Sequence, residues 1–467
     1  MFLTLILLIL GGIFLLLAIT ILIYPKIKYN WLEKTIYLLI LSLPFERIPS
    51  FDTPFGTLRI SQILTITACY FIFLLYLKKD EKIINLKLNS KLVYIVLFFL
   101  FSIPSWFFVV SDKKFIVTMV ATILCFLAYF LISHFSKVTF EIYHKLLLVI
   151  LATCFFGIYQ IVFDYLDFPI ILTGLRQTYT KEVFGIARIH STALEPLYFA
   201  GMLFLPIFST ILFIISKHKI WGKWQFSNVF VFSIYILVFL LTLSKSAWLV
   251  LILTGIPFSI YIFRRMQLVE FLKTIRWVGG FLVLITTLGL IYSEKIFTIA
   301  KGLFLHIIGT FTFNQATSVE RLSFLKVAFK TLYQNSFLGI GSGQYEFYAT
   351  KILPPTISID KISEEVSELP NIGLIVNNVY IEIWLEFGLL SLIIFLIFLY
   401  KNLKPAYISL ITIKNSLSEQ NIMRVAIFFS LITYLLQWFF FSPIFIMPIF
   451  ILLGMLENIN KQKINEI

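Results

Sequence analysis

The sequence predicts an all-α polytopic integral membrane protein with about thirteen transmembrane helices, within a range of about twelve to fourteen. Three observations support this fold class. Hydrophobic residues make up 60% of the 467 positions and charged residues only 13%, and the mean hydropathy of +0.95 lies outside the range of soluble globular proteins. Apolar runs of membrane-spanning length recur along the chain. Lysine and arginine concentrate in the short loops between these runs.

Each span is expected where an apolar run approaches the roughly 20 residues that cross a bilayer core. The first run, at residues 2–24, lacks the basic start and the small-residue cleavage site of a signal peptide, so we expect it to be retained as a span. A short run from Thr35 to Phe45 is included and completes the set. The other runs are centred on residues 2–24, 60–77, 91–111, 115–133, 143–165, 196–216, 226–243, 246–263, 277–293, 378–400, 423–441 and 443–457.

The loops predict which side of the membrane each part of the chain faces. The net charge of +14 comes mainly from one alternate set of short loops, which the positive-inside rule places in the cytoplasm. This use of the basic residues argues against nucleic acid as a partner. The other side receives residues 46–59, a loop at about 166–195, a tight turn in LTLSKSAW and a segment from about 294 to 376. The working face is therefore predicted to be extracytoplasmic.

Three regions are expected along the chain. They are an N-terminal transmembrane bundle (1–293), a long extracytoplasmic loop (294–376), and C-terminal transmembrane helices with a short cytoplasmic tail (377–467). So long a connection is typical of a functional or self-structured unit. Within it, TSVERLSFLKVAFKTLYQ begins with a capping box and predicts an amphipathic helix on the membrane surface. Its apolar stripe comprises Val319, Leu322, Leu325, Phe329 and Leu332.

A glycine-rich stretch, GIGSGQY, follows this predicted helix and contains Gly339, Gly341 and Gly343. A nucleotide-binding loop would require a preceding strand and a following helix, and the sequence indicates neither. We therefore interpret the stretch as a sharp turn.

Polar residues gather at three places on the predicted outer face. In ARIHSTALEPLYFAGM, Arg188, His190 and Glu195 precede a helix that opens at Pro196. Glu195 is either a helix cap or a reactive carboxylate, and Arg188 is either an interfacial side chain or an anion ligand. His190 is either a general base or a hydrogen-bonded bystander.

Two further cations lie on the same predicted face. Lys245 stands in a tight turn between two spans, where a topology anchor is not expected. Arg321 lies on the predicted amphipathic helix, where a solvated position is the alternative. Together with Arg188, these cations suggest recognition of a membrane-bound anion such as a phosphate group.

The stretch IVNNVYIEIWLEFGLLSL places unusual polarity at the start of a predicted span. Asn378, Glu382 and Glu386 are four residues apart, so they share one stripe of a helix, and Asn377 precedes them. Ionisable groups within a span are typical of functional sites. We expect this stripe to face a cavity and to bind sugar hydroxyls or the cations, with helix packing as the alternative.

The three cysteines indicate no metal chemistry. Cys69, Cys125 and Cys154 all lie in apolar runs, where a thiol behaves as a small hydrophobic group. We expect neither a disulfide nor a metal site.

Taken in order, the motifs resemble the landmarks of the O-antigen ligase and polymerase superfamily of bacterial membrane glycosyltransferases. ARIHSTALEPLYFA is followed by LTLSKSAWLVLIL, by ERLSFLKVAFKTLYQNSFLGIGSGQYEF and by NNVYIEIWLEFGLLSLIIFL. The architecture is similar over about Thr35 to Glu457. The resemblance implies a GT-C-like fold and a metal-independent, cofactor-free transfer of glycan from a polyprenyl diphosphate on the outer side of the bacterial plasma membrane.

The resemblance also implies roles for individual residues. Arg188 and Arg321 match arginines that bind the diphosphate, whereas Lys245 stands in place of an arginine and lacks its bidentate fork. The implied catalytic residues are Arg188, Glu195 and Arg321. The resemblance and the polar residues described above together predict the substrate-binding residues Lys245, His190, Gly341, Gly343, Asn377, Asn378, Glu382 and Glu386.

One departure from the family favours a polymerase over a ligase. Ligases that act on a lipid core typically show His-Asn where this chain has Asn377 and Asn378, whereas Glu195 followed by proline resembles polymerases. We therefore expect a polymerase of lipid-linked repeat units of O-antigen, capsule or exopolysaccharide. Its expected partners are donor and acceptor oligosaccharides on polyprenyl diphosphate, membrane lipids and a chain-length regulator protein. A ligase and, less favoured, a flippase of lipid-linked oligosaccharides are the alternatives.

Overall fold

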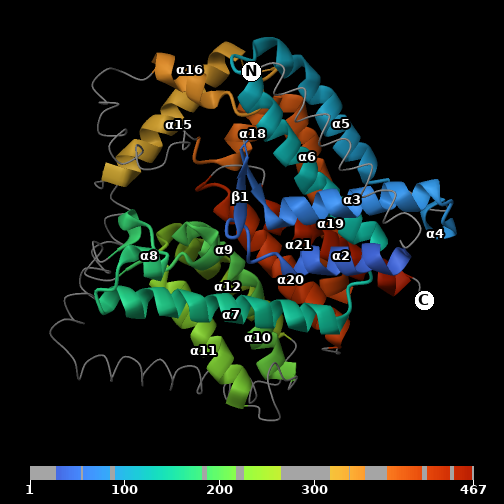
Figure 1. Ribbon diagram of the computed structural model, residues 1–467, viewed down its shortest axis with the longest axis vertical. Coiled ribbons are helices and arrows are strands. Elements are labelled where there is room, and N and C mark those ends of the chain that lie inside the picture. Colours follow the sequence, from blue (N-terminus) through green and yellow to red (C-terminus); the bar gives the residue numbers. More distant parts are fainter. Residues whose placement is uncertain are drawn as a thin grey trace.

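The computed structural model is a bundle of helices that run in several directions (Figure 1). It describes residues 28–53, 56–84, 90–180, 187–216, 226–264, 316–335, 337–352, 376–412, 418–441 and 446–464. The predicted spans at 2–24 and 277–293 lie outside these residues.

The elements of the N-terminal part, in chain order, are α2 (Tyr29–Leu41), β1 (Ser50–Thr53), β2 (Gly56–Arg59), α3 (Ile60–Leu77), α4 (Glu81–Ile84), α5 (Leu92–Ser102), η1 (Ile103–Phe108), α6 (Asp112–Phe135), α7 (Phe140–Tyr165), α8 (Ile170–Thr173), η2 (Gln177–Tyr179), η3 (Ser191–Ala193), α9 (Pro196–Met202), α10 (Phe204–Ser216), α11 (Phe226–Leu241) and α12 (Lys245–Phe263). The C-terminal part contains α15 (Ala316–Asn335), α16 (Tyr345–Ile352), α18 (Val379–Phe387), α19 (Leu389–Thr412), α20 (Glu419–Gln437) and α21 (Met447–Ile464).

The prediction of a polytopic membrane protein is confirmed. Among the described residues, six helices are long and apolar enough to cross a membrane, namely α3, α6, α7, α9 together with α10, α12, and α19. Helix formation is the expected outcome for such runs, because in lipid the backbone must satisfy its own hydrogen bonds. The predicted runs at 91–111 and 226–243 correspond to shorter apolar helices, Leu92–Phe108 and Asn228–Leu241.

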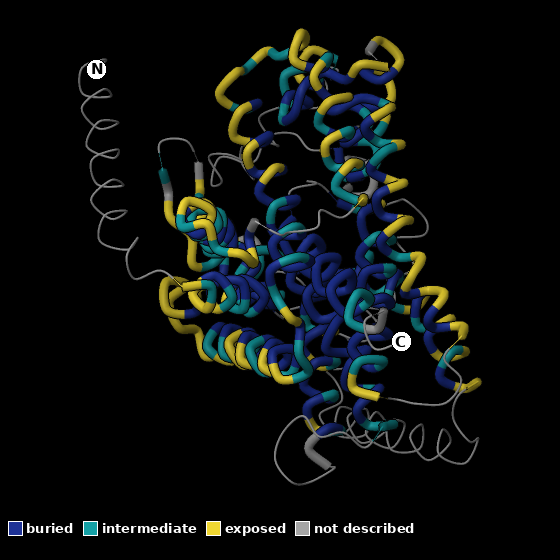
Figure 2. The backbone as a smooth tube through the Cα atoms, turned by 90° about the vertical axis from the view of Figure 1, so that its right-hand side faces the viewer, coloured by how far each residue is buried: buried dark blue, intermediate teal, exposed yellow. Residues whose placement is uncertain are grey.

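The bundle is built around a buried centre, which Figure 2 shows as the dark middle of the molecule. There α21 packs along α6, α19 against α5, and α20 against α10. The ring of Phe126 lies at the junction, 4.9 Å from the ring of Phe450 and 5.7 Å from that of Phe398, both edge-on. Edge-to-face contacts of this kind add to the free energy gained from apolar burial.

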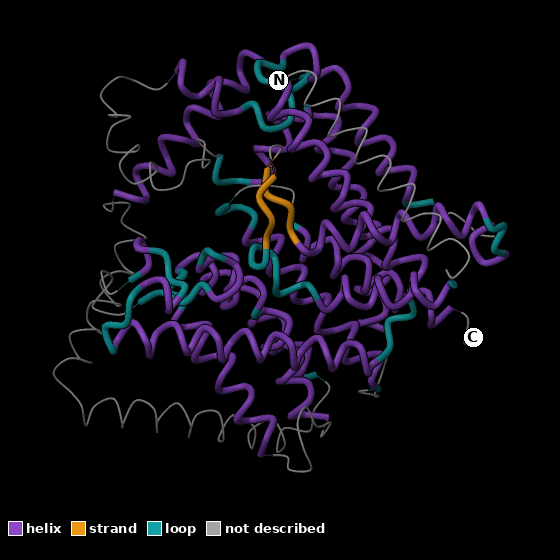
Figure 3. Tube along the Cα trace, viewed as in Figure 1, coloured by secondary structure: helices purple, strands orange, loops and turns teal. Residues whose placement is uncertain are grey.

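A small β-hairpin was not predicted. Strands β1 and β2 pair antiparallel, with Ser50 opposite Arg59 and Thr53 opposite Gly56, and both are drawn in orange near the centre of the view in Figure 3. The segment is rich in Pro and polar residues and too short for a period-2 apolar pattern, so the sequence carried little strand signal. The hairpin places Arg59 directly before α3.

The prediction of one continuous helix from 378 to 400 is wrong. The helix breaks at Gly388, where φ is +92°, and α18 and α19 lie on either side of it. The chain around residues 337–341 pairs with the break, because Ile340 N donates to Leu385 O over 2.8 Å and Leu389 N donates to Phe337 O over 3.3 Å. A Cβ at Gly388 would lie 2.9 Å from two carbonyl oxygens. The close approach of this backbone therefore requires glycine.

The predicted amphipathic helix is confirmed as α15, but its buried face differs from the predicted stripe. Val327, Ala328 and Leu332 are buried against α16 and α18, whereas Phe329 is 51% exposed. The spacing of apolar residues predicted the helix, but packing against α16 and α18 determines which of its faces is buried. Leu332 belongs both to the predicted stripe and to the buried face.

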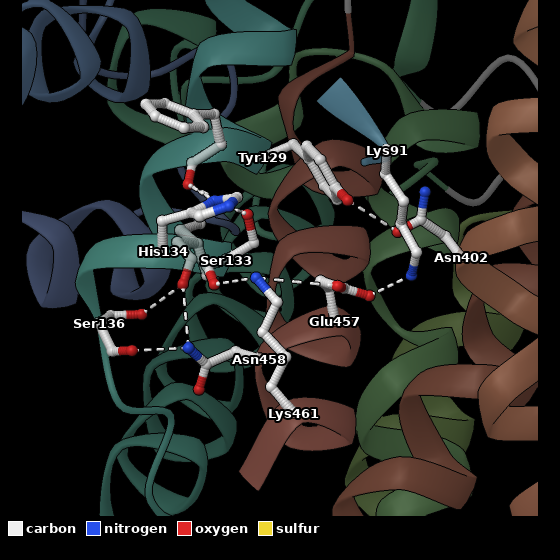
Figure 4. Close-up of polar contacts among 11 residues, drawn as sticks. Lys91, Tyr129, Ser133, His134, Ser136, Asn402, Glu457, Asn458 and Lys461 are labelled. Carbon is white, nitrogen blue, oxygen red and sulfur yellow. Dashed lines mark hydrogen bonds and ion pairs between the residues drawn. The ribbon is translucent and has the colours of Figure 1, made fainter. Parts of the chain in front are cut away.

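The end of the bundle formed by α6, α19 and α21 carries a dense set of polar contacts, here called the C-terminal network (Figure 4). Lys91 forms an ion pair with Glu457, and Tyr129 donates a hydrogen bond to Asn402 over 2.8 Å. Lys461 donates to the carbonyl of Ser133 over 3.1 Å. Further contacts of the network involve Asn458, which bonds to Ile132, Ser136 and Val138.

Candidate functional site

Four arginines and two glutamates approach one another near the N-terminus of α9, and we call this group the arginine cluster. Glu46 and Arg47 follow α2, Arg59 ends β2, Arg176 precedes η2, Arg188 precedes η3, and Glu195 stands directly before α9. Electrostatic interactions connect Arg47 with Glu46 and Glu195, and Arg176 with Arg47 and Glu195. The cluster therefore collects residues from four separate connections.

Hydrogen bonds fix two of these connections to each other. The hydroxyl of Thr192 donates to the carbonyl of Pro44 over 2.5 Å, and Ile48 N donates to the carbonyl of Thr192 over 3.0 Å. The loop that carries Glu46 and Arg47 is thus held against the segment that leads into Glu195. Such loops position polar side chains on a rigid helical scaffold.

Glu46 and Arg59 form the buried ion pair of the cluster. The Nη1 atom of Arg59 lies 3.3 Å from Oε1 of Glu46, whose side chain is only 1% exposed. Burial raises the pKa of Glu46, although Arg59 and Arg47 oppose the shift. Removing one partner of such a pair would leave an uncompensated buried charge, so the two residues are expected to be retained together.

Arg47 is held differently. Its guanidinium lies over the ring of Tyr198, 4.8 Å from the ring centroid, a distance at which a cation–π interaction is favourable. Its Nε atom is buried and has no hydrogen-bond partner among the described residues. Burial works to lower the pKa of Arg47, but Tyr198, Glu46 and Glu195 outweigh it and the pKa is raised, so the side chain is a permanent cation.

Arg188 reaches the turn between α11 and α12. Its Nε donates to the carbonyl of Thr242 over 3.3 Å, and its guanidinium lies 5.4 Å from the ring centroid of Tyr179. The same turn leads into Lys245, the first residue of α12. The structure therefore places two of the sequence-predicted cations beside one tight turn.

His190 is tied to the backbone of the loop. Its Nε2 accepts a hydrogen bond from Arg176 N over 3.3 Å, and its Nδ1 lies 3.0 Å from the carbonyl of Ser191. Burial lowers the pKa of His190 to about 4, so the ring is neutral and Nδ1 donates to that carbonyl. Of the two sequence alternatives, the geometry supports the hydrogen-bonded bystander.

Glu195 occupies the N-cap position of α9, but its side chain makes no capping hydrogen bond to the helix. Pro196 occupies the first helical turn, where a missing N–H costs nothing. The carboxylate is partly exposed and interacts electrostatically with Arg47, Arg176 and Tyr179. It is thus the more exposed of the two acidic members of the cluster.

The glycine turn and Glu386 form a second polar site, here called the glycine-turn dock. Gly339, Gly341 and Gly343 all have positive φ, which confirms the predicted sharp turn, although α16 does follow it. Oε2 of Glu386 accepts a hydrogen bond from Gly343 N over 2.8 Å, and Gly341 N donates to the carbonyl of Glu386 over 3.0 Å. The carboxylate thus holds the turn against α18.

The other polar residues of this stretch also have local partners. The Asn378 side chain caps α18 by accepting a hydrogen bond from Ile381 N over 3.1 Å, and Asn377 adopts a left-handed conformation with φ of +58°, which asparagine tolerates. Glu382 lies buried one turn further along α18. Two members of the stripe that was expected to face a cavity, Asn378 and Glu386, therefore accept hydrogen bonds from the backbone.

Arg321 lies on α15, and its side chain is outside the described atoms. The structure brings Arg188, Glu195 and Lys245 into the region of α9 and the α11–α12 turn, whereas Gly341, Gly343, Asn378 and Glu386 belong to the glycine-turn dock. The predicted site residues thus separate into two groups.

Sequence reasoning missed Arg47, Arg59 and Arg176. A signal was present, because all three lie in loops assigned to the outer face, where the positive-inside rule predicts few cations. Lys245 shows the same signal, because its turn is also assigned to the outer face. Their convergence depends on the tertiary fold.

Metal-ligating side chains and thiols also occur in the described part of the chain. No group of three His, Cys, Asp or Glu residues there could hold a metal ion. The three cysteines are free, and Cys125 and Cys154 are buried.

Fold and site together define a polytopic helical membrane protein whose loops bring a cluster of cations together beside α9. Residues 230–396 match the family model described as O-Antigen ligase. The sequence resemblance is thereby confirmed, and members of this family are membrane glycosyltransferases of polysaccharide biosynthesis. The match includes Lys245, Arg321 and the glycine-turn dock, whereas Arg188 and Glu195 precede it. No curated protein matches the chain.

Proposed function

We propose that this protein is a polymerase that joins oligosaccharide repeat units carried on polyprenyl diphosphate, at the outer face of a bacterial plasma membrane. The observation that carries the proposal is the arginine cluster beside Glu195, in a chain whose residues 230–396 match the O-Antigen ligase family. Diphosphate is a good ligand for clustered arginines, because guanidinium forks match phosphate oxygens.

The proposed reaction is a displacement at the anomeric carbon of the donor glycan. A hydroxyl of the acceptor sugar attacks this carbon, the bond from the carbon to the phosphate oxygen breaks, and polyprenyl diphosphate leaves with the bonding electrons. Glu195 takes the proton of the attacking hydroxyl. Arg188, Lys245 and Arg321 compensate the charge that develops on the leaving diphosphate, which is where electrostatic stabilisation lowers the barrier most.

A ligase is the second candidate, because the matching family model is described by that activity. Against it, the ligase-type histidine is replaced by Asn377. Asn378 caps α18 through its side chain, so it is engaged in the fold. A flippase is less favoured. Transporters built from repeated halves hold polar groups near the membrane midplane, whereas the cations of this chain come from loops assigned to the outer face.

Gel electrophoresis of surface polysaccharide from a strain lacking this gene tests the proposal. A polymerase predicts single repeat units on the final anchor. Polymer that still forms but is not transferred would indicate a ligase, and loss of all repeat units from the outer face would indicate a flippase. In addition, the purified protein should extend lipid-linked repeat units in the presence of a chelator; no extension under conditions where a related polymerase works would contradict the proposal.

A further inference from the structure

Arg47 differs from the other cations of the arginine cluster in what surrounds it. Arg59 has Glu46 at 3.3 Å, and Arg188 donates to the carbonyl of Thr242. No ion pair or hydrogen bond joins the Arg47 guanidinium to any side chain that the structure describes, and its buried Nε has no hydrogen-bond partner there. Its one close partner there is the ring of Tyr198.

The surroundings hold Arg47 in place without using its hydrogen-bonding capacity. Tyr198 supports one face of the guanidinium, and the backbone on either side is fixed through Ile48 N and the carbonyl of Pro44 to Thr192. Glu46, the adjacent carboxylate, is already engaged by Arg59. A guanidinium has five N–H donors in a planar fork. A held fork with unused donors is prepared for a planar or tetrahedral oxyanion.

The position of Arg47 relates it to the reaction. Glu195, the proposed base, interacts electrostatically with Arg47, and Tyr198 lies in the first turn of α9, directly after Glu195. Arg47 also lies far before residues 230–396, so the family match assigns it no role. Arg47 is half-buried as a residue, so it is not fully enclosed by the protein.

We propose that Arg47 binds a phosphate oxygen of the lipid-linked diphosphate substrate, with Tyr198 and the Glu46–Arg59 ion pair as the residues that position it. The inference rests on the proposed function, which supplies the diphosphate. Structural water on the buried Nε would satisfy one donor only, whereas a diphosphate oxygen placed against the fork satisfies two.

Binding of farnesyl diphosphate to the full-length protein in detergent micelles tests this assignment. The variants are Arg47→Ala, Arg47→Gln and Arg47→Lys, and Lys145→Ala is the matched control, since Lys145 is an exposed cation paired with Glu141. Farnesol serves as the uncharged probe. We expect the Kd for farnesyl diphosphate to rise about tenfold in Arg47→Ala and Arg47→Gln, and about threefold in Arg47→Lys, which keeps charge but loses the fork.

The control variant should bind both probes as the wild type does, and farnesol binding should be the same in every variant. Arg47→Gln retains a polar side chain of similar length, so it reports on charge even if Arg47→Ala does not fold. Unchanged farnesyl diphosphate binding in folded Arg47→Gln would overturn the role of Arg47 and leave the proposed function standing. A wild type that prefers farnesyl diphosphate no more than farnesol would instead count against the proposed function itself.

Discussion

The arginine cluster and the C-terminal network are both polar regions in a largely apolar chain, but their charges are compensated differently. In the C-terminal network both cations have an oxygen partner: Lys91 pairs with Glu457, and Lys461 bonds to the carbonyl of Ser133. In the arginine cluster, four arginines share two glutamates, and Arg47 has no such oxygen in the described part of the chain. The first arrangement compensates its charges within the bundle, while the second leaves an excess of positive charge, which the proposed function uses for binding.

This difference matters because buried charge is costly unless it is compensated. A region that compensates its charges internally gains nothing from a ligand. A region with excess cations becomes more favourable when an anion arrives, so the excess itself is evidence for a ligand. The comparison predicts that substitutions in the two regions separate activity from stability.

The largest effect is expected for Arg188→Ala. Loss of one cation from the leaving-group site should lower glycosyl transfer by at least about 100-fold, because the charge of the departing diphosphate is left less compensated. The amount of folded protein should change little, since Arg188 lies in a loop and is only half-buried. Polymer length on gels and protein level on immunoblots measure the two effects. Normal polymer in this variant would remove Arg188 from the site.

The reverse pattern is expected for Glu457→Gln in the C-terminal network. This change leaves Lys91 without its carboxylate in a setting where the two side chains are only 14% and 5% exposed. We expect unfolding in detergent to become easier by about 3 kcal/mol, while turnover per folded molecule is unchanged.

Glu141→Gln is the matched control for this experiment. Its pair with Lys145 is 74% and 55% exposed, so removing the charge should leave stability almost unchanged, because solvent screens the pair. Equal effects of the two substitutions would contradict the contrast between buried and exposed pairs.

A smaller effect is expected at the glycine-turn dock than at the arginine cluster or the C-terminal network. Gly388→Ala would force a Cβ to within 2.9 Å of the carbonyl oxygens of Phe337 and Leu338 at a φ of +92°, and should destabilise the dock by about 2 kcal/mol. Gly255→Ala is the control, because nothing lies within 4 Å of a Cβ there. Protease sensitivity of the long segment should increase for Gly388→Ala alone; equal sensitivity in both variants would argue against the dock.

The smallest effect is a pH dependence that originates at His190. Its pKa is lowered to about 4 by burial, whereas an unfolded histidine titrates near 6.5. As pH falls below 6.5 the unfolded state takes up the proton first, so the stabilisation present above pH 6.5 is lost towards pH 4. Between pH 7 and pH 5 the loss should be about 1 to 2 kcal/mol. Thermal unfolding of the wild type and of His190→Gln measures it, and identical pH profiles would contradict the assignment.

The helices were largely predictable because each long apolar run has one way to satisfy its backbone in lipid. Predicted run 60–77 coincides with α3, Ile60–Leu77, and run 143–165 lies within α7. The turn before Lys245 was also predicted, since the polar tripeptide Ser-Lys-Ser lies between two apolar runs. These features depend on neighbours in sequence.

The parts that were not predicted depend on residues far apart in the chain. The break at Gly388 exists because residues 337–341 bond to it, and the burial of the Val327 face of α15 follows from its neighbours α16 and α18. Likewise, Arg47 and Arg188 come from loops separated by several helices. No local pattern carries such information, so the candidate site could be identified from the sequence only at Arg188, Glu195 and Lys245.

The pairing of the glycine turn with the break at Gly388 also constrains biosynthesis. Residues 337–341 leave the ribosome before residues 385–389, so the turn must wait for its hydrogen-bonding partner. The two can meet only if the long segment already lies on the same side of the membrane as the break. We therefore expect α18 and α19 to separate late in insertion, and a delay in translocating the long segment would leave residues 379–412 in the translocon as one overlong span.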